Sequence, residues 1–168
     1  MLDDYLHRNL KTMPAFRALL RAVEACFYRD MALDEPVLDV GCGDGTFASE
    51  AIGVPILAGM DVKFRELSRT DGQESYDAFV QARAQEMPFA NSSFGSAVSN
   101  SVLEHIPDVE DVVCELGRVL RAGSTLVFSV PSEHFLSLLS VSRFLRILGL
   151  AKLAAVYEMF FNKISRHH

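Results

Sequence analysis

Three glycines at alternate positions, Gly41, Gly43 and Gly45, follow the short apolar run VLDV, which contains Asp39. Glycine adopts positive φ readily and, having no Cβ, lets a ligand approach the backbone closely. A phosphate-binding loop requires a lysine after its last glycine, and a dinucleotide-binding loop requires a third glycine where this chain has Thr46. The spacing therefore points away from a phosphate cradle.

A second acidic residue, Asp61, follows the apolar run at residues 55–60. In a strand–loop–helix–strand arrangement, an acid at the tip of the second strand accepts hydrogen bonds from ribose hydroxyls. The glycine loop and Asp61 together predict a nucleoside ligand. The alternatives are an ordinary tight turn for the glycines and a solvated strand end or helix cap for Asp61.

The elements that would position these residues alternate along the chain. Apolar runs of strand length occur at residues 36–40, 55–60, 76–82, 96–101 and 124–130. Amphipathic segments at 46–52, 62–70 and 107–123 read as helices between them. The alternation predicts an α/β fold, with a doubly wound, mainly parallel sheet and helices on both faces. Ligands bind such sheets beyond the carboxyl ends of the strands, where the glycine loop, Asp61 and residues 99–106 would meet.

Four segments, in order and spacing, resemble successive motifs of the class I S-adenosylmethionine-dependent methyltransferases. They are VLDVGCGDGTFA (37–48), GMDVKF (59–64), EMPFANSSFGSAVSNSVLEHIPD (86–108) and ELGRVLRAGSTLVFSVP (115–131). The likeness is greatest to the small-molecule group whose motifs include LPF, SFD and LEH, and it covers residues 36–131. It implies a Rossmann-like domain that binds S-adenosylmethionine, methylates a small-molecule acceptor, lipid-like molecules included, and releases S-adenosylhomocysteine.

The resemblance also implies where the cofactor lies. Asp39 would lie near its amino group, the glycine loop under its methionine part, Asp61 at the ribose and Val62 at the adenine. Residues 82–85 would approach the adenine edge. The implied cofactor-binding residues are Asp39, Gly41, Cys42, Gly43, Gly45, Asp61, Val62, Arg83, Ala84, Gln85, Asn100 and Ser101.

The chain departs from the family pattern at Arg83, where an acid usually meets the adenine amine, and at Gly95, which replaces the acid of SFD. Arginine only donates hydrogen bonds, so Gln85 or a backbone carbonyl would accept from that amine. The family sheet has seven strands, and its last two form an antiparallel hairpin. The segment after Val130 reads as helical, so we expect a sheet without the last two strands and a truncated chain.

Methyl transfer from a sulfonium is an in-line displacement that needs positioning and a water-poor site. A base is needed only for a hydroxyl or an acidic carbon. His105, in LEHI, is the candidate catalytic base, because imidazole titrates near neutral pH. The alternative is a structural role for His105 at a strand-to-helix junction. The cysteines form no cluster with metal-ligand spacing, so no metal site is predicted.

The chain has 168 residues, 49% of them apolar, which suits one domain with a substantial core. We expect a helical N-terminal cap at 1–30, a cofactor-binding core at 36–131 and a helical lid or tail at 132–168.

The net charge of −6 argues against general nucleic-acid binding. Residues 131–168 carry five Lys or Arg against two Asp or Glu. This basic, apolar tail would be core or lid, or would contact a lipid surface. Its exposed apolar surface would favour a homodimer.

The sequence predicts a cytoplasmic protein without a membrane span. The three cysteines are far apart, and no run of about 18 uncharged apolar residues occurs. Asp3 and Asp4 stand where a signal peptide would carry positive charge.

Two other functions stay open. A catalytically silent S-adenosylmethionine-binding or partner module on the same fold is suggested by Arg83, Gly95 and the missing hairpin. A nicotinamide dehydrogenase rests on fold analogy alone, and the glycine spacing disfavours it.

Overall fold

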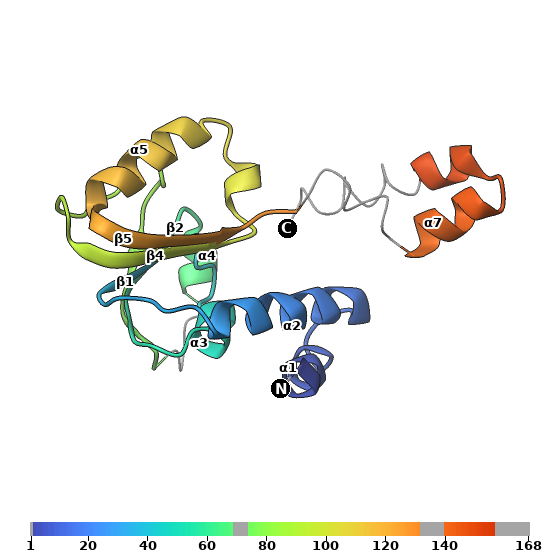
Figure 1. The fold of residues 1–168 in the computed structure, drawn as a ribbon, viewed down its shortest axis with the longest axis horizontal. Coiled ribbons are helices and arrows are strands. Elements are labelled where there is room, and N and C mark those ends of the chain that lie inside the picture. Colours follow the sequence, from blue (N-terminus) through green and yellow to red (C-terminus); the bar gives the residue numbers. More distant parts are fainter. Residues whose placement is uncertain (1, 69–73, 132–139, 157–168) are drawn as a thin grey trace. The chain divides into compact units, whose positions relative to one another are not determined.

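The computed structural model describes residues 2–68, 74–131 and 140–156, and they fall into two compact units divided between Ser129 and Val130 (Figure 1). The predicted tail lies only partly within this range, since residues 132–139 and 157–168 are outside the described residues.

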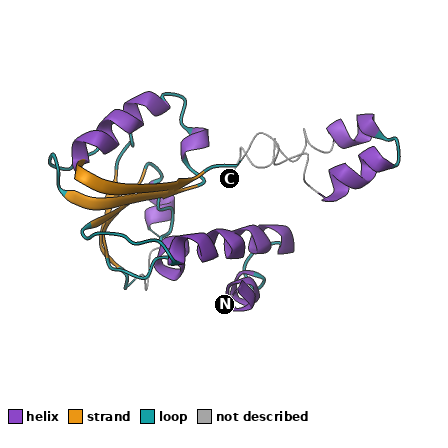
Figure 2. Ribbon diagram, viewed as in Figure 1, coloured by secondary structure: helices purple, strands orange, loops and turns teal. Residues whose placement is uncertain are grey.

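The first unit contains one parallel sheet of five described strands in the order β3-β2-β1-β4-β5 (Figure 2). The strands are β1 (Val37–Val40), β2 (Ile56–Asp61), β3 (Tyr76–Gln81), β4 (Phe94–Asn100) and β5 (Leu120–Ser129). The strand order reverses between β1 and β4, which places a topological switch point beside the glycine loop. The predicted α/β, doubly wound fold is confirmed.

Helices cover both faces of this sheet, as Figure 1 shows. One face carries α1 (Leu2–Asn9), α2 (Ala15–Arg29) and α3 (Thr46–Ala51), and α5 (Val109–Val119) covers the other. The short α4 (Phe64–Leu67) follows β2. Every residue of β1 is buried, because Val37 faces the first core while Leu38 and Val40 face the second. Burial on both faces is why β1 reads as a continuous apolar run.

The end of α5 differs from the prediction. The sequence predicts a helix over 107–123, with Gly123 just after its end, but α5 stops at Val119 and Leu120 begins β5. Leu120 pairs with Phe94, and the register shifts before the next pair. Gly123 has a φ of +81° within the strand, so it marks an irregularity in β5 rather than a helix end.

The second unit contains α7 (Ser140–Ile147) and a further helical segment at residues 151–156, as predicted for the part of the tail that is described. Between them Gly149 takes a φ of +74° and donates to the carbonyl of Arg146, a helix-ending turn. Exposed apolar side chains are numerous here: Ile147, Leu148, Leu150, Leu153 and Val156. Within the described ranges, no helix is long and apolar enough to cross a membrane.

Candidate functional site

The glycine loop leaves β1 at Gly41 and enters α3 after Gly45. The amides of Gly41 and Cys42 donate to the carbonyl of Met60 at 2.7 and 3.0 Å, which holds the loop against the end of β2. Gly41 has a φ of +77°, and a Cβ there would lie 2.4 Å from a Val102 methyl group. At Gly43, by contrast, a Cβ would meet no described atom within 4 Å. The loop is therefore closely packed at its start and open at its middle, where a ligand could approach.

Asp61 joins this loop to the tip of β2. Its Oδ2 accepts from the Gly43 amide at 3.0 Å, and its Oδ1 accepts from the Lys63 amide at 2.8 Å. An ionised carboxylate offers about four lone-pair sites, so about two remain for other donors. Asp61 can therefore shape the loop and still accept hydrogen bonds from ribose hydroxyls. The sequence did not indicate the first of these roles.

Asp39 lies behind the loop and is almost fully buried, with 5% of its surface exposed. The Tyr76 hydroxyl donates to its Oδ2 at 2.6 Å. Tyr76 reaches it by lying across Gly59, where a Cβ would come within 2.7 Å of the ring. Burial raises the pKa of Asp39 to about 7, against the opposing effect of the Tyr76 hydrogen bond. The carboxyl group is thus held by Tyr76, and its contact with the cofactor's amino group stays a prediction.

Cys42 turns its side chain into the core beside Tyr76. Burial raises the pKa of its thiol well above the usual range, so the thiol stays protonated near neutral pH. A protonated thiol is a poor nucleophile. The backbone amide of Cys42 donates to Met60 and its carbonyl accepts from Gly45, so the contact of Cys42 with the cofactor stays a prediction.

The predicted adenine side is assembled around Asp61. Val62 is 58% exposed, and its carbonyl accepts from Gln81 Nε2 at 3.1 Å. The amide of Ala82 donates to the Asp61 carbonyl at 3.1 Å, so the predicted adenine-edge segment begins beside Asp61. Within that segment Arg83 is exposed, while Ala84 and Gln85 are half-buried.

The loop that follows is tied to α5 by two charged residues that the motif analysis missed. Arg118 donates to the carbonyls of Met87 at 2.8 Å and Phe89 at 2.7 Å. Glu115 accepts from the Met87 amide at 2.8 Å and from Arg118. The hydrogen bond from Arg118 lowers the pKa of Glu115 to about 2. Their spacing of three residues on one helix was the available signal, since such pairs face each other.

The carboxyl end of β4 carries a polar cluster. Asn100 Nδ2 donates to Glu24 Oε2 at 3.0 Å, and the Ser101 hydroxyl donates to Glu24 Oε1 at 3.3 Å. The Ser129 hydroxyl donates to Asn100 Oδ1, which links the ends of β4 and β5. Glu24, on α2, lies 76 residues from Asn100 in sequence, and no sequence pattern indicated this contact.

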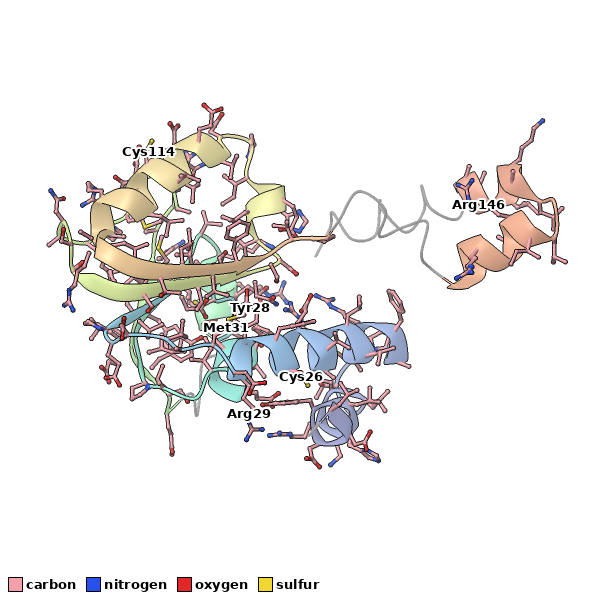
Figure 3. The ribbon with its side chains drawn as sticks, in the orientation of Figure 1. Cys26, Tyr28, Arg29, Met31, Cys114 and Arg146 are labelled. Atoms are coloured by element: carbon pink, nitrogen blue, oxygen red, sulfur yellow. The ribbon has the colours of Figure 1, made fainter. Side chains whose placement is uncertain are left out.

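Two further α2 side chains reach toward the same edge. Arg21 donates to Glu24 at 3.2 Å, and its guanidinium carbon lies 5.0 Å from the centre of the Phe47 ring. The Tyr28 hydroxyl donates to the Ser99 carbonyl at 2.8 Å. Figure 3 shows Tyr28 directed toward the sheet and Arg29 directed away from it. The N-terminal helix α2 thus contributes side chains to the carboxyl edge.

His105 ends a short 3₁₀ turn, η1 (Leu103–His105), just beyond that cluster. Its side chain is 55% exposed, and its Nε2 lies 3.9 Å from Glu104 Oε1. No contact tests its role as a base, which stays a prediction.

Gly95 lies at the other end of β4, about 16 Å from Asn100 at the usual strand rise. A Cβ there would come within 2.7 Å of the carbonyl oxygens of Asp34 and Glu35. Gly95 therefore makes room for the chain entering β1. That the replacement of the family's acid by Gly95 accompanies a catalytically silent module stays a hypothesis.

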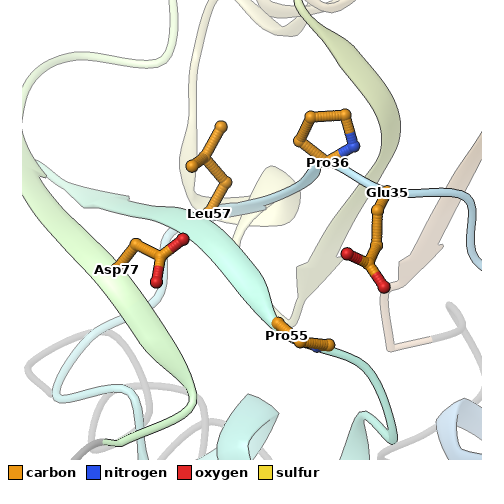
Figure 4. Close-up of a pocket in the computed structure, with 5 residues that line it drawn as sticks. All are labelled: Glu35, Pro36, Pro55, Leu57 and Asp77. Carbon is orange, nitrogen blue, oxygen red and sulfur yellow. The ribbon is translucent and has the colours of Figure 1, made fainter.

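A shallow hollow at the amino ends of β1, β2 and β3 is also distant from the loop (Figure 4). Its lining residues are Glu35, Pro36, Pro55, Leu57 and Asp77. Over the described part of the chain, no group of three or more His, Cys, Asp or Glu side chains could hold a metal ion.

A family described as "Methyltransferase domain" matches residues 38–128. A malonyl-(acyl-carrier protein) O-methyltransferase of Enterobacter lignolyticus is 33% identical over 95 residues, covering 55% of this chain and 38% of that protein. The chain spans roughly half the length of several curated relatives that it matches.

Solved structures share the fold. A SAM-dependent methyltransferase from Thermotoga maritima superposes with a TM-score of 0.61 at 18% identity, covering 68% of this chain and 53% of that one. The (4+2)-cyclase SpnF gives a TM-score of 0.54 at 22% identity, covering 69% and 46%.

Proposed function

The chain belongs to the methyltransferase domain family, and from this premise we propose that it binds S-adenosylmethionine and transfers the cofactor's methyl group to a small-molecule acceptor. The cofactor would lie along the carboxyl edge of the sheet, at the switch between β1 and β4.

The observation that carries this proposal is the hydrogen bond between Gly43 and Asp61. It brings the open middle of the glycine loop within 3.0 Å of a carboxylate that retains acceptor capacity. A ribose with two adjacent hydroxyls matches such an acceptor. Exposed Val62 beside it offers an apolar surface for a base.

When bound, S-adenosylmethionine supplies an activated methyl group on a cationic sulfur. The residues of this chain would orient it. The loop from Gly41 to Gly45 would support the methionine part, and Asn100 and Ser101 would lie beside the reacting end. These contributions position the donor for in-line attack.

The acceptor is proposed as a small molecule. One relative is named as a malonyl-(acyl-carrier protein) O-methyltransferase, a name that indicates methylation of an oxygen atom. A carboxylate needs no deprotonation, whereas a hydroxyl acceptor would use His105 as the base. Acceptors with lipid-like character are included in this proposal.

A cofactor-binding module without methyl transfer is the second candidate. The (4+2)-cyclase among the fold neighbours shows that this fold does not by itself specify methyl transfer.

The test has two stages. Isothermal titration calorimetry with S-adenosylhomocysteine and with NADH should detect binding of the first only. Labelled S-adenosylmethionine is then incubated with panels of small carboxylic acids, hydroxy compounds and acyl chains. Absence of S-adenosylhomocysteine binding by folded protein would refute both candidates, while binding without transfer to any acceptor would favour the second.

A further inference from the structure

The ion pair between Arg21 and Glu24 occupies an unusual place for charged residues of a cap helix. Both side chains are about three-quarters buried, with 25% and 26% of their surface exposed. They lie between the start of α3, through Phe47, and the end of β4, through Asn100 and Ser101. In the proposed function, these two elements would flank the methionine part of the cofactor.

Arg21 has donors to spare. A guanidinium presents five N–H donors in a rigid plane, and Arg21 makes one hydrogen bond to a described residue, that to Glu24. Its guanidinium carbon also lies over the Phe47 ring, 5.0 Å from the ring centre, a cation–π contact that restrains the group. A partly buried, pre-oriented guanidinium with unfilled donors suits a carboxylate, which it can bind through two parallel hydrogen bonds.

Glu24 supplies the opposite charge 3.2 Å away. Its Oε2 accepts from Arg21 and Asn100, and its Oε1 accepts from Ser101, which leaves acceptor capacity on Oε1. Asn100 and Ser101 hold the carboxylate in place, so it would need little reorganisation on meeting a cation. One positive and one negative group side by side are complementary to a zwitterion.

We propose that Arg21 and Glu24 form the subsite for the α-amino acid group of the cofactor, with Arg21 pairing with its carboxylate and Glu24 accepting from its ammonium. The inference rests on the proposed function, because it assumes that a nucleoside carrying an amino acid binds at the glycine loop. Arg21 and Glu24 are binding residues in this proposal, not catalytic ones.

The experiment compares two ligands by titration calorimetry. S-adenosylhomocysteine carries the amino acid group, whereas 5′-methylthioadenosine keeps the adenosine and the thioether but lacks that group. Arg21→Gln should weaken S-adenosylhomocysteine binding by roughly 10- to 100-fold, the usual range for a charge-assisted bidentate pair. Binding of 5′-methylthioadenosine should change by less than about two-fold. Arg21→Lys, which keeps the charge but loses the bidentate geometry, should fall between wild type and Arg21→Gln.

Glu24→Gln should also weaken only S-adenosylhomocysteine, by up to about tenfold, since an amide still accepts a hydrogen bond from the ammonium. Arg29→Gln is the matched control, because Arg29 is exposed on the same helix and directed away from the sheet. It should leave both affinities unchanged.

The outcomes separate the two proposals. If folded wild-type protein binds neither ligand, the proposed function fails and this inference fails with it. If wild type binds both and the Arg21 variants weaken both equally, or neither, the proposed function stands and the subsite assignment is wrong. Thermal melts verify folding, and Arg21→Lys gives the answer if Arg21→Gln does not fold.

Discussion

The two halves of the carboxyl edge are built differently. At the ends of β1 and β2, backbone groups take part in the contacts of Gly43 with Asp61 and of Val62 with Gln81, which lie 18 and 19 positions apart. At the ends of β4 and β5, side chains dominate, and Glu24 contacts residues 76 and 77 positions away. The first half is held by backbone hydrogen bonds, and in the proposed function it would receive the ribose and the base. The second depends on how α2 docks, so its chemistry can vary with a few side chains.

The largest effect on ligand binding is expected from Asp61→Ala, which tests the first half alone. It removes the Gly43 anchor and the proposed acceptor for ribose hydroxyls, so affinity should fall about 100-fold or more. Unlike the Arg21 variants, it should weaken S-adenosylhomocysteine and 5′-methylthioadenosine alike. Calorimetry with both ligands measures this, and Asp77→Asn, exposed at the opposite edge, is the control. Selective loss of one ligand would contradict the division into two halves.

Asp39→Asn tests the buried support beneath the first half. The folded-state pKa of about 7 lies above the ordinary value of 3.8, so the folded protein binds the proton more tightly than the unfolded chain. The stability that Asp39 contributes should therefore be greatest below about pH 4, decline as pH rises to 7 and then level off. The amide introduced by the substitution would still accept from Tyr76 without ionising. The variant should match wild type at pH 4 and exceed it by up to about 4 kcal/mol at pH 8.

Urea unfolding at pH 4, 6 and 8 measures this difference, with Asp77→Asn again as the control. Parallel pH profiles for wild type and Asp39→Asn would show that burial of Asp39 does not raise its pKa.

Gly41→Ala tests the point where the halves meet, since Gly41 contacts Val102 beyond β4. A left-handed alanine costs about 1–2 kcal/mol, and the clash with Val102 adds about 1–2 kcal/mol. Gly43→Ala should lose only the free energy of the left-handed backbone, because a Cβ at Gly43 would meet no described atom within 4 Å. Urea denaturation should therefore give a lower free energy of unfolding for Gly41→Ala than for Gly43→Ala. Adding Val102→Ala should restore part of the difference, and equal losses for the two glycine variants would refute the role of Val102.

The smallest effect is expected from Glu115→Gln, which lies outside both halves. The folded-state pKa of about 2 lies below the ordinary 4.5, so Glu115 stabilises the protein above pH 4.5 and loses that effect as pH falls toward 2. The pair lies at the surface of α5, with 20% of the Glu115 and 32% of the Arg118 side chain exposed, so solvent screening should keep the loss of stability at pH 7 small. Thermal melts across this pH range should show the variant and wild type converging in acid. The neighbouring exposed Glu86→Gln should show no such convergence.

The difference between the two halves of the carboxyl edge also explains which features could be predicted from the sequence. The strands, the glycine loop and the position of Asp61 follow from hydrophobic pattern, glycine spacing and short connections. Arg21 and Glu24 could not be identified, because on an amphipathic helix they look like solvent-facing charges until α2 packs on β4. The hydrogen bond from Tyr76 to Asp39 requires that Gly59 have no side chain, because the Tyr76 ring lies across it. Gly59 is on a third strand, β2, so the contact could not be predicted from β1 and β3 alone. The misplaced end of α5 came from interpreting Gly123 as a helix terminator, when strand pairing with β4 takes precedence.

The span of Tyr76 across Gly59 has a consequence for motion. Edge strands ordinarily fray first, independently of the sheet centre. Here β3 cannot detach without withdrawing the hydroxyl that satisfies Asp39 on the central strand, and an unpaired buried carboxyl is costly. Amide hydrogens of β3 should thus exchange in concert with those of β1 rather than ahead of them. The edge strand β3 and the central strand β1, which leads into the glycine loop, should therefore open together as one cooperative unit.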